Sequence, residues 1–363
     1  MTSPAPSRPR ILWVDIIRTL SGFGVLFTHV AMEIVNYWGK RPIQTGDEGW
    51  WITSVFYSFT WRVCLGLFFM LSGYLLLSKQ SETFTFLRKS LWKLLVPLAF
   101  WGTFYLIWRG DLPEDPLKLV KQIILTLVTG KVEYHMWFLY PFIGIYLFVP
   151  IIRIFIRTAE DRDVWYWVGL WFLLVPVSTL FFQYTGDVIA LMNFGAFSGF
   201  IGFFLLGHLL GRSTLDPKWA LIAGLLVLPW TVGETYWLYS QTRALKAMQD
   251  QWFDTLSITM IPHTILVFIA LKGWGERLQR SLKASSRVPA IWETLSRAGF
   301  GTILLHVFIL ENMYSGFGGI HLAPYDFHPA LSVPIVSLVG YGIGLVVVLV
   351  VQKIPYVRAI LPV

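Results

Sequence analysis

The chain has 363 residues, of which 55% are hydrophobic and 14% are charged, and 29 Lys and Arg against 21 Asp and Glu give a net charge of +8. Soluble domains contain about 45–50% apolar and about 25% charged residues, so this chain has too few charges to cover a soluble surface. The composition excludes a soluble enzyme and a disordered chain, and it indicates an all-α polytopic membrane protein. The one cysteine, Cys64, excludes a disulfide framework and a cysteine-based metal site.

Apolar runs long enough to cross a bilayer recur along the whole chain. A helix needs about 20 apolar residues to cross about 30 Å of hydrocarbon. This rule predicts ten membrane-spanning helices with no room for a soluble domain between them, so residues 1–363 are expected to form one transmembrane domain. The predicted spans are 12–35, 50–77, 91–108, 136–156, 164–182, 192–211, 219–239, 252–271, 293–314 and 331–351. Residues 116–129 are too short and too charged to span, and predict an amphipathic helix at a membrane surface.

The basic residues differ in number between the two sides of the predicted bundle. If the N-terminus is cytoplasmic, 20 Lys and Arg fall in inside segments and eight fall in outside segments. Cytoplasmic segments of membrane proteins are enriched in these residues, so both termini are predicted to be cytoplasmic. In this orientation Lys118, Lys121 and Lys131 are among the outside basic residues.

The first span carries the most informative polar side chains. Arg18 and His29 are eleven residues apart, which places them on one helix face about 16.5 Å apart along the axis. Glu33 lies one turn beyond His29 and is predicted to orient its imidazole. Taken alone, Arg18 fits a topology charge that snorkels to the interface, and His29 fits a core histidine bonded to a neighbouring helix. Their shared face favours a functional pair.

The second span contains Arg62, which lies sixteen residues from the inner end, as His29 does in the first span. The two side chains are therefore predicted to lie at similar depth, where the charge of Arg62 would keep His29 neutral. The alternative is a structural ion pair between Arg62 and Glu33. Ser72 and Gly73 form a small pair that suits helix packing or the passage of a ligand between helices.

A basic cluster precedes the third span, where Arg88, Lys89 and Lys93 lie at helical spacing. These residues fit topology charges that face anionic lipid, or a clamp for a polyphosphate ligand that arrives from the cytoplasm.

The remaining histidines are spread over several spans. His135 and Trp137 open the fourth span on the outer side, where Trp137 also fits an interfacial belt. His306 lies in the middle of the ninth span. His263 follows Pro262, and we interpret it as a structural residue that satisfies backbone groups freed by the proline.

Taken together, these residues resemble acyltransferase family 3 of the membrane-bound O-acyltransferases over essentially the whole chain. The resemblance rests on Asp15-x-x-Arg18 with His29, FFMLSGYLL around Ser72-Gly73, the basic cluster leading to Pro97, HMWFLY with His135 and Trp137, FFLLGHLLGR, and S-x-x-x-F-G-x-x-L-L-H ending at His306. Lys89, Ser90 and Lys93 stand where the family often has arginine. This departure weakens the predicted clamp, because lysine is a poorer bidentate partner for phosphate.

The resemblance implies an acyl-CoA donor, usually acetyl-CoA, on the cytoplasmic side of a bacterial inner membrane. It implies a carbohydrate or lipid-linked glycan acceptor on the outer side, such as an exopolysaccharide or lipopolysaccharide, with membrane lipids as surroundings. No metal and no nucleic-acid partner is expected. The residues assigned on this basis are His29, Glu33 and Arg62 to catalysis, Arg18, Ser72, Gly73, Arg88, Lys89 and Lys93 to acyl-CoA, and His135, Trp137 and His306 to the acceptor.

A transporter or flippase for a glycan or a small polar solute is the alternative class, because charged groups inside spans suit it as well. The sequence shows no inverted repeat and no matching pair of broken helices, which favours the enzyme.

Overall fold

The computed structural model describes residues 11–37, 48–79, 81–110, 112–187, 198–249, 254–283, 285–319, 321–355 and 357–362. Within these ranges every regular element is a helix, which confirms the all-α prediction for them. The longer helices are α1 (Leu12–Tyr37), α4 (Thr83–Arg109), α6 (Leu139–Thr158), α7 (Asp161–Thr185), α9 (Pro217–Leu245), α10 (Met260–Ser281), α11 (Val288–Ser315) and α12 (Pro329–Val351). The shorter helices are α2 (Glu48–Arg62), α3 (Cys64–Leu77), α5 (Pro116–Thr129) and α8 (Ser198–Arg212), with 3-10 turns η1 (Tyr134–Met136), η4 (Phe317–Gly319) and η5 (Val357–Ala359).

Eight helical stretches in the described part of the chain are long and apolar enough to cross a bilayer. The chain is therefore a multi-pass membrane protein. The other two predicted spans, 192–211 and 252–271, overlap α8, which has 15 residues, and α10, whose last turns carry charged side chains. Parts of both predicted spans lie outside the described residues. The count of ten and the orientation in the membrane stay predictions.

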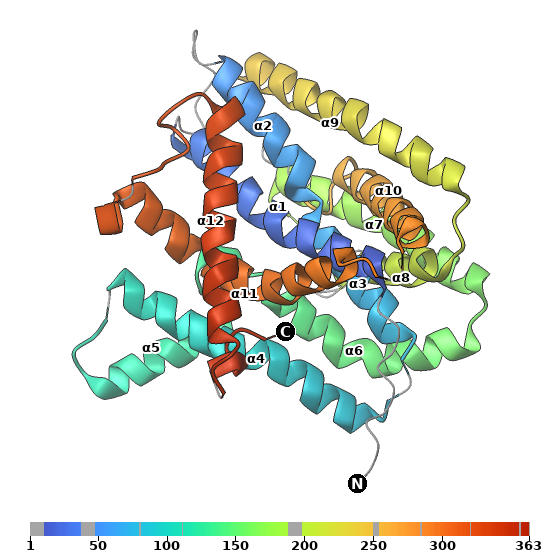
Figure 1. Ribbon diagram of the computed structural model, residues 1–363, viewed down its shortest axis with the longest axis horizontal. Helices are drawn as coiled ribbons and strands as arrows, with labels where there is room; N and C mark the ends of the chain where they lie inside the picture. Colours follow the sequence, from blue (N-terminus) through green and yellow to red (C-terminus); the bar gives the residue numbers. More distant parts are fainter. Residues whose placement is uncertain are drawn as a thin grey trace.

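Helix α1 lies at the centre of the molecule (Figure 1) and contacts α2, α3, α10, α11 and α12. Glycines allow this close approach. A Cβ atom at Gly24 would overlap the side chains of Trp61 and Cys64, and one at Gly275 of α10 would overlap Trp13. Small residues at such contacts are the usual way in which helices come close in a membrane, where packing and not hydrophobicity drives association.

The second predicted span, 50–77, agrees with the apolar stretch Glu48–Leu77, within which the structure has two helices. The helix is divided at Val63, between α2 and α3. Val63 keeps helical dihedral angles (φ −60°, ψ −16°), so the break is a local distortion and not a loop. Kinks usually occur at proline or glycine, and neither is present here, which explains why the sequence pattern did not show the break. The break directly follows Arg62.

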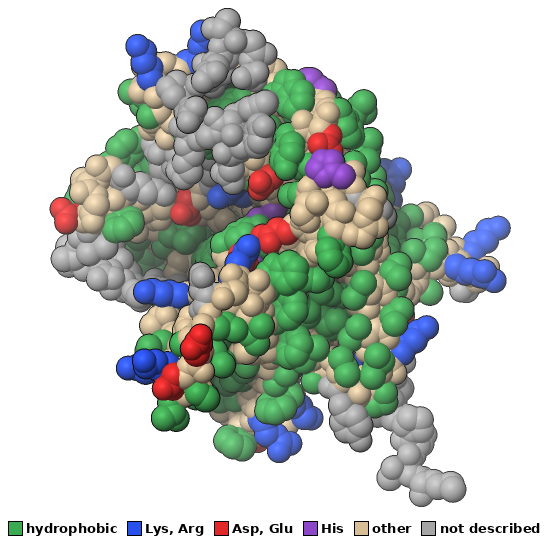
Figure 2. All heavy atoms as spheres, turned by 90° about the vertical axis from the view of Figure 1, so that its left-hand side faces the viewer, with side chains coloured by type: hydrophobic (Ala, Val, Ile, Leu, Met, Phe, Trp, Pro, Cys, Tyr) green, Lys and Arg blue, Asp and Glu red, His purple; other side chains and the backbone are tan. Residues whose placement is uncertain are grey.

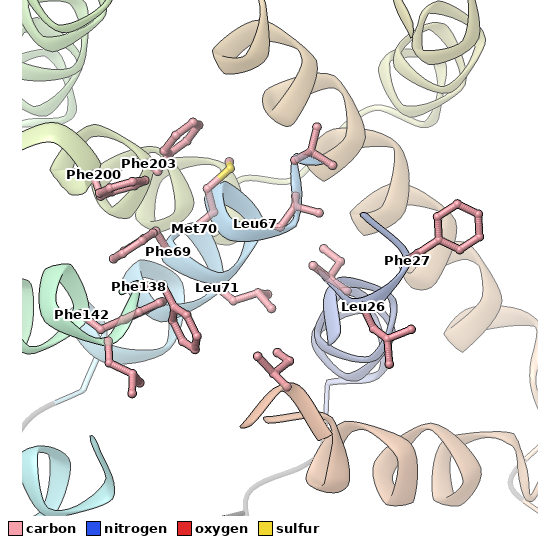
Figure 3. Packing of buried hydrophobic residues seen from close by; sticks show 14 of the residues in the cluster. Leu26, Phe27, Leu67, Phe69, Met70, Leu71, Phe138, Phe142, Phe200 and Phe203 are labelled. Carbon is pink, nitrogen blue, oxygen red and sulfur yellow. The ribbon is translucent and has the colours of Figure 1, made fainter. Parts of the chain in front are cut away.

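Helix α3 is held from both sides by tight packing. On one side, Gly73 faces the backbone of α8, where an added Cβ would overlap the carbonyl of Phe204. On another side, the ring of Phe69 stacks between Phe142 of α6 and Phe200 of α8, with ring centroids 3.9 and 4.5 Å apart (Figure 3). This packing fixes the position of α3 relative to α6 and α8.

Candidate active site

His29 lies on a side of α1 that neighbouring helices leave partly open. Its neighbours Leu26 and Val30 are 1% and 0% exposed, whereas Arg18, Val25 and His29 keep partial exposure. These three residues share one face, because seven and eleven residues correspond to about two and about three helical turns. Helix α1 packs against α2, α3, α10, α11 and α12, and the partial exposure of these three side chains marks a side of α1 that its neighbours do not fully cover.

Three histidines from three elements form a row. The ring centroid of His29 lies 4.9 Å from that of His306 on α11, which lies 4.8 Å from that of His135 in η1. Tyr134 contacts His29 at 5.2 Å, and Tyr105 of α4 contacts His135 at 5.0 Å. The structure thus brings the predicted catalytic histidine together with two residues predicted to bind the acceptor. No group of three His, Cys, Asp or Glu side chains suited to a metal ion occurs within the described ranges.

Hydrogen bonds to backbone carbonyls indicate which ring nitrogen of His306 and of His135 carries the hydrogen in the neutral ring. Nδ1 of His306 lies 2.6 Å from the carbonyl oxygen of Ile303, so Nδ1 carries the hydrogen and Nε2 holds a lone pair. Nε2 of His135 lies 3.3 Å from the carbonyl oxygen of Leu304, so in His135 the lone pair is on Nδ1. Both lone-pair nitrogens are buried without a hydrogen-bond partner among the described residues. Such atoms are uncommon, and each can accept a hydrogen bond from a group that enters the site.

Two further predicted residues lie near this row. Arg62, at the end of α2, lies close enough to His29 for their charges to interact. Glu33 interacts electrostatically with Glu311 of α11 and with the phenol of Tyr134. The predicted roles of Arg62 and Glu33 in catalysis stay predictions.

An ion-pair network that was not predicted joins the elements that carry the row. Arg109, the last residue of α4, donates two hydrogen bonds to Glu133 (2.9 and 2.8 Å) and two to Glu311 (3.1 and 2.7 Å). Bidentate contacts of this kind fix the relative orientation of the groups that they join. We call Glu33, Arg109, Glu133, Tyr134 and Glu311 the polar mouth. The side of the molecule that carries α4 and α5 has a hollow where histidine, acidic and basic side chains gather (Figure 2).

A second polar group lies on α1 toward its N-terminal end. Arg18 donates a hydrogen bond to the hydroxyl of Ser296 on α11 (3.3 Å), and the hydroxyls of Ser72 and Tyr146 lie 3.5 Å apart. Tyr146 also interacts electrostatically with Arg18. Arg18 and Ser72, both predicted to bind acyl-CoA, therefore lie together with two residues that were not predicted. A guanidinium with three hydroxyls from different helices can bind carbonyl, amide or phosphate groups.

The remaining predicted residues lie apart from both groups. Gly73 packs on α8, as described above. Arg88, Lys89 and Lys93 are exposed in the first half of α4, and Trp137 is 48% exposed. Their assignment to donor and acceptor binding stays a prediction.

A comparison with models of protein families finds one match. Residues 11–352 match the model of an acyltransferase family that is described as an acyltransferase domain. The match includes the histidine row, the polar mouth and the polar group around Arg18. No curated protein and no solved structure matches the chain.

Proposed function

The chain belongs to acyltransferase family 3, and we propose on this premise that it transfers an acetyl group from cytoplasmic acetyl-CoA to a hydroxyl of a carbohydrate at the outer side of a bacterial inner membrane. One observation carries the proposal: on the central helix α1, the ring of His29 contacts that of His306, and Arg18 lies on the same face of α1 eleven residues away. Acyl transfer between reactants from opposite sides requires a base at such a place.

The proposed reaction begins with attack of the acceptor hydroxyl oxygen on the thioester carbonyl carbon. Neutral His29 takes the hydroxyl proton as the new C–O bond forms, a contribution of about 10²–10⁴-fold in rate. The C–S bond then breaks, and the imidazolium returns the proton to the departing thiolate, so the products are the sugar ester and free CoA. An alternative order, in which His29 first carries the acetyl group, uses the same residue.

Two neighbours of His29 support this step. The positive charge of Arg62 acts on His29 and stabilises the oxyanion, an interaction often worth about 3–4 kcal/mol. The lone pair on Nε2 of His306 is available to accept a hydrogen bond from the ring N–H of His29. Such a bond would determine which nitrogen of His29 acts as the base. His306 then acts as a positioning residue in addition to its predicted contact with the acceptor.

The two substrates approach from opposite ends of α1. On the cytoplasmic side, Arg18 and Ser72 border the path of the acyl-CoA arm, and its phosphates bind the predicted basic cluster Arg88, Lys89 and Lys93. On the outer side, the carboxylates of the polar mouth accept hydrogen bonds from sugar hydroxyls. Tyr134, which is 54% exposed, and Trp137 offer aromatic faces to sugar rings.

Purified protein in lipid vesicles, supplied with acetyl-CoA and surface glycans from a strain that lacks the protein, tests the proposal. We expect CoA thiol release that requires both substrates, acetylated glycan by mass spectrometry, and thermal stabilisation by acetyl-CoA in the absence of glycan. Movement of glycan across the bilayer without CoA release would establish the transporter or flippase class instead.

A further inference from the structure

Helix α5 (Pro116–Thr129) leaves the bundle and returns to it at the polar mouth. Arg109 precedes α5 and Glu133 follows it, and two hydrogen bonds join these residues. The two ends of the segment that contains α5 are therefore held together. The sequence encodes the limits of the helix. The Asp115 side chain accepts hydrogen bonds from two backbone N–H groups at its start, and Gly130 ends it with a left-handed φ of 73°. None of its residues is buried.

The apolar side chains of α5 face in two directions. Leu127 packs toward α4, where a Cβ at Gly102 would lie 2.7 Å from its side chain. Four others form an open stripe at helical spacing: Leu117 (82% exposed), Val120 (53%), Ile124 (54%) and Val128 (75%). In a membrane protein, an open apolar stripe on an amphipathic helix lies in the boundary between lipid headgroups and acyl chains.

A groove of about 330 Å³ lies on the polar side of α5. Its lining residues are Lys118, Lys121, Gln122, Leu125, Thr126, Thr129 and Lys131. In the described part of the chain, none of the three lysines forms an ion pair with a carboxylate. Three ammonium groups and two hydroxyls around one small groove are suited to a phosphate or diphosphate group.

The charge of the groove is opposite to that of its surroundings. The polar mouth holds three carboxylates and one guanidinium, whereas the groove holds three lysines and no acid. In the proposed orientation these lysines lie on the outer side, where basic residues are usually scarce. A topology role therefore does not account for them, whereas a phosphate ligand does.

We propose that α5 binds the lipid-phosphate anchor of a lipid-linked glycan acceptor, an inference that rests on the proposed function. The tail lies along the apolar stripe, the phosphate lies in the lysine groove, and the sugar reaches the polar mouth. The apolar stripe and the lysine groove lie on different faces of α5, and Glu133 of the polar mouth follows Lys131 of the groove by two residues. Ordinary anionic phospholipid has no sugar to place in the mouth, and its phosphate is a diester with one negative charge, whereas the phosphate of a polyprenyl phosphate is a monoester with up to two for the three lysines to bind.

Binding of a polyprenyl phosphate to the full chain in detergent tests this assignment by native mass spectrometry. The matched ligands are unphosphorylated polyprenol and phosphatidylglycerol. The variant is K118Q/K121Q/K131Q, and the control K246Q/K283Q/K353Q removes the same charge from exposed lysines elsewhere. We expect wild type and control to bind polyprenyl phosphate at least tenfold more tightly than either matched ligand, and the groove variant to lose at least tenfold in affinity. Unchanged binding by the groove variant, or equally tight binding of phosphatidylglycerol, would overturn the proposal.

This measurement does not need turnover, so it separates the two proposals. The variant His29→Ala is expected to bind polyprenyl phosphate as wild type does. If the wild-type protein binds polyprenyl phosphate but transfers no acetyl group, the proposed function is overturned and the role of α5 is kept. If the wild-type protein transfers acetyl groups but does not bind polyprenyl phosphate, the proposed function is kept and the role of α5 is overturned.

Discussion

Two sets of buried histidines show how the same side chain serves a structural and a candidate catalytic role. In α10, Nδ1 of His263 lies 2.8 Å from a carboxylate oxygen of Glu234, and its Nε2 lies 3.3 Å from the hydroxyl of Thr231. His306 is equally buried, at 0% exposure, yet its Nε2 has no partner in the described residues and its ring contacts His29. Burial therefore does not identify a working histidine. What distinguishes His306 from His263 is an unpartnered nitrogen together with a ring contact to His29, the proposed base.

The structural interpretation of His263 agrees with its contacts, although the expected partner was different. Pro262 lies in the first turn of α10, where backbone N–H groups have no intrahelical partner in any case. The proline therefore frees few backbone groups for His263 to satisfy. Its partners are instead side chains of α9, which ties the two helices together.

The variant His29→Ala is expected to have the largest effect among the tests of the difference between the histidine row and His263. We expect acetyl transfer to fall by about 10²–10⁴-fold, because the proposed base is lost, while the thermal midpoint and acetyl-CoA binding stay near the wild-type values. CoA release and glycan acetylation measure the effect. Transfer at the wild-type rate would remove His29 from the mechanism.

His306 offers a sharper test, because two substitutions separate positioning from packing. His306→Leu removes both the hydrogen bond to Ile303 and the lone pair toward His29, and we expect kcat to fall toward the lower end of the about 10²–10⁴-fold range. His306→Gln keeps a donor and an acceptor, and should recover part of this loss. Equal kcat values for the two variants would indicate that His306 only fills space.

The helices themselves followed from the sequence more readily than the site did. Long apolar runs predict α1, α4, α6, α7, α9, α11 and α12 within several residues at each end. The helix α5 follows from its charged face and its caps. The sequence does not show which face of each spanning helix packs against the other helices. Lipid and protein neighbours are both apolar, so the periodicity that marks the buried face of a helix in a soluble protein is weak here.

The polar mouth escaped prediction for a related reason. Arg109 meets Glu133 over 24 residues and Glu311 over 202 residues, and each stands near a helix end, where charged residues are ordinary. The spacing of Arg18 and His29 was visible because both lie on one helix. Contacts between helices leave no such mark in a single sequence, so the sequence assigns His29 to catalysis and His135 and His306 to the acceptor without showing that the three rings meet.

The fully partnered histidine predicts an effect on stability and not on catalysis. His263→Ala leaves the carboxyl of Glu234 buried without its partner, a loss of about 1–3 kcal/mol in unfolding free energy. The double variant His263→Ala/Glu234→Ala should cost less than the sum of the single variants. Thermal unfolding in detergent measures both, and kcat at a temperature below the transitions should remain within about twofold of wild type. A loss of kcat comparable with that of His29→Ala would contradict the division between the two sets.

The smallest effect is expected at Arg109, which supports the histidine row without touching it. Its guanidinium is 43% exposed, so water screens its ion pairs and each is worth about 1 kcal/mol or less. Arg109→Lys keeps the charge but cannot make bidentate contacts with both Glu133 and Glu311. We expect the KM for the glycan to rise severalfold while kcat changes little, because the mouth loosens but His29 and His306 keep their contact. A fall in kcat with an unchanged KM would mean that the ion pairs of Arg109 hold the histidine row itself in place. The row of His29 and His306 would then depend on a neighbouring ion pair, as His263 depends on Glu234.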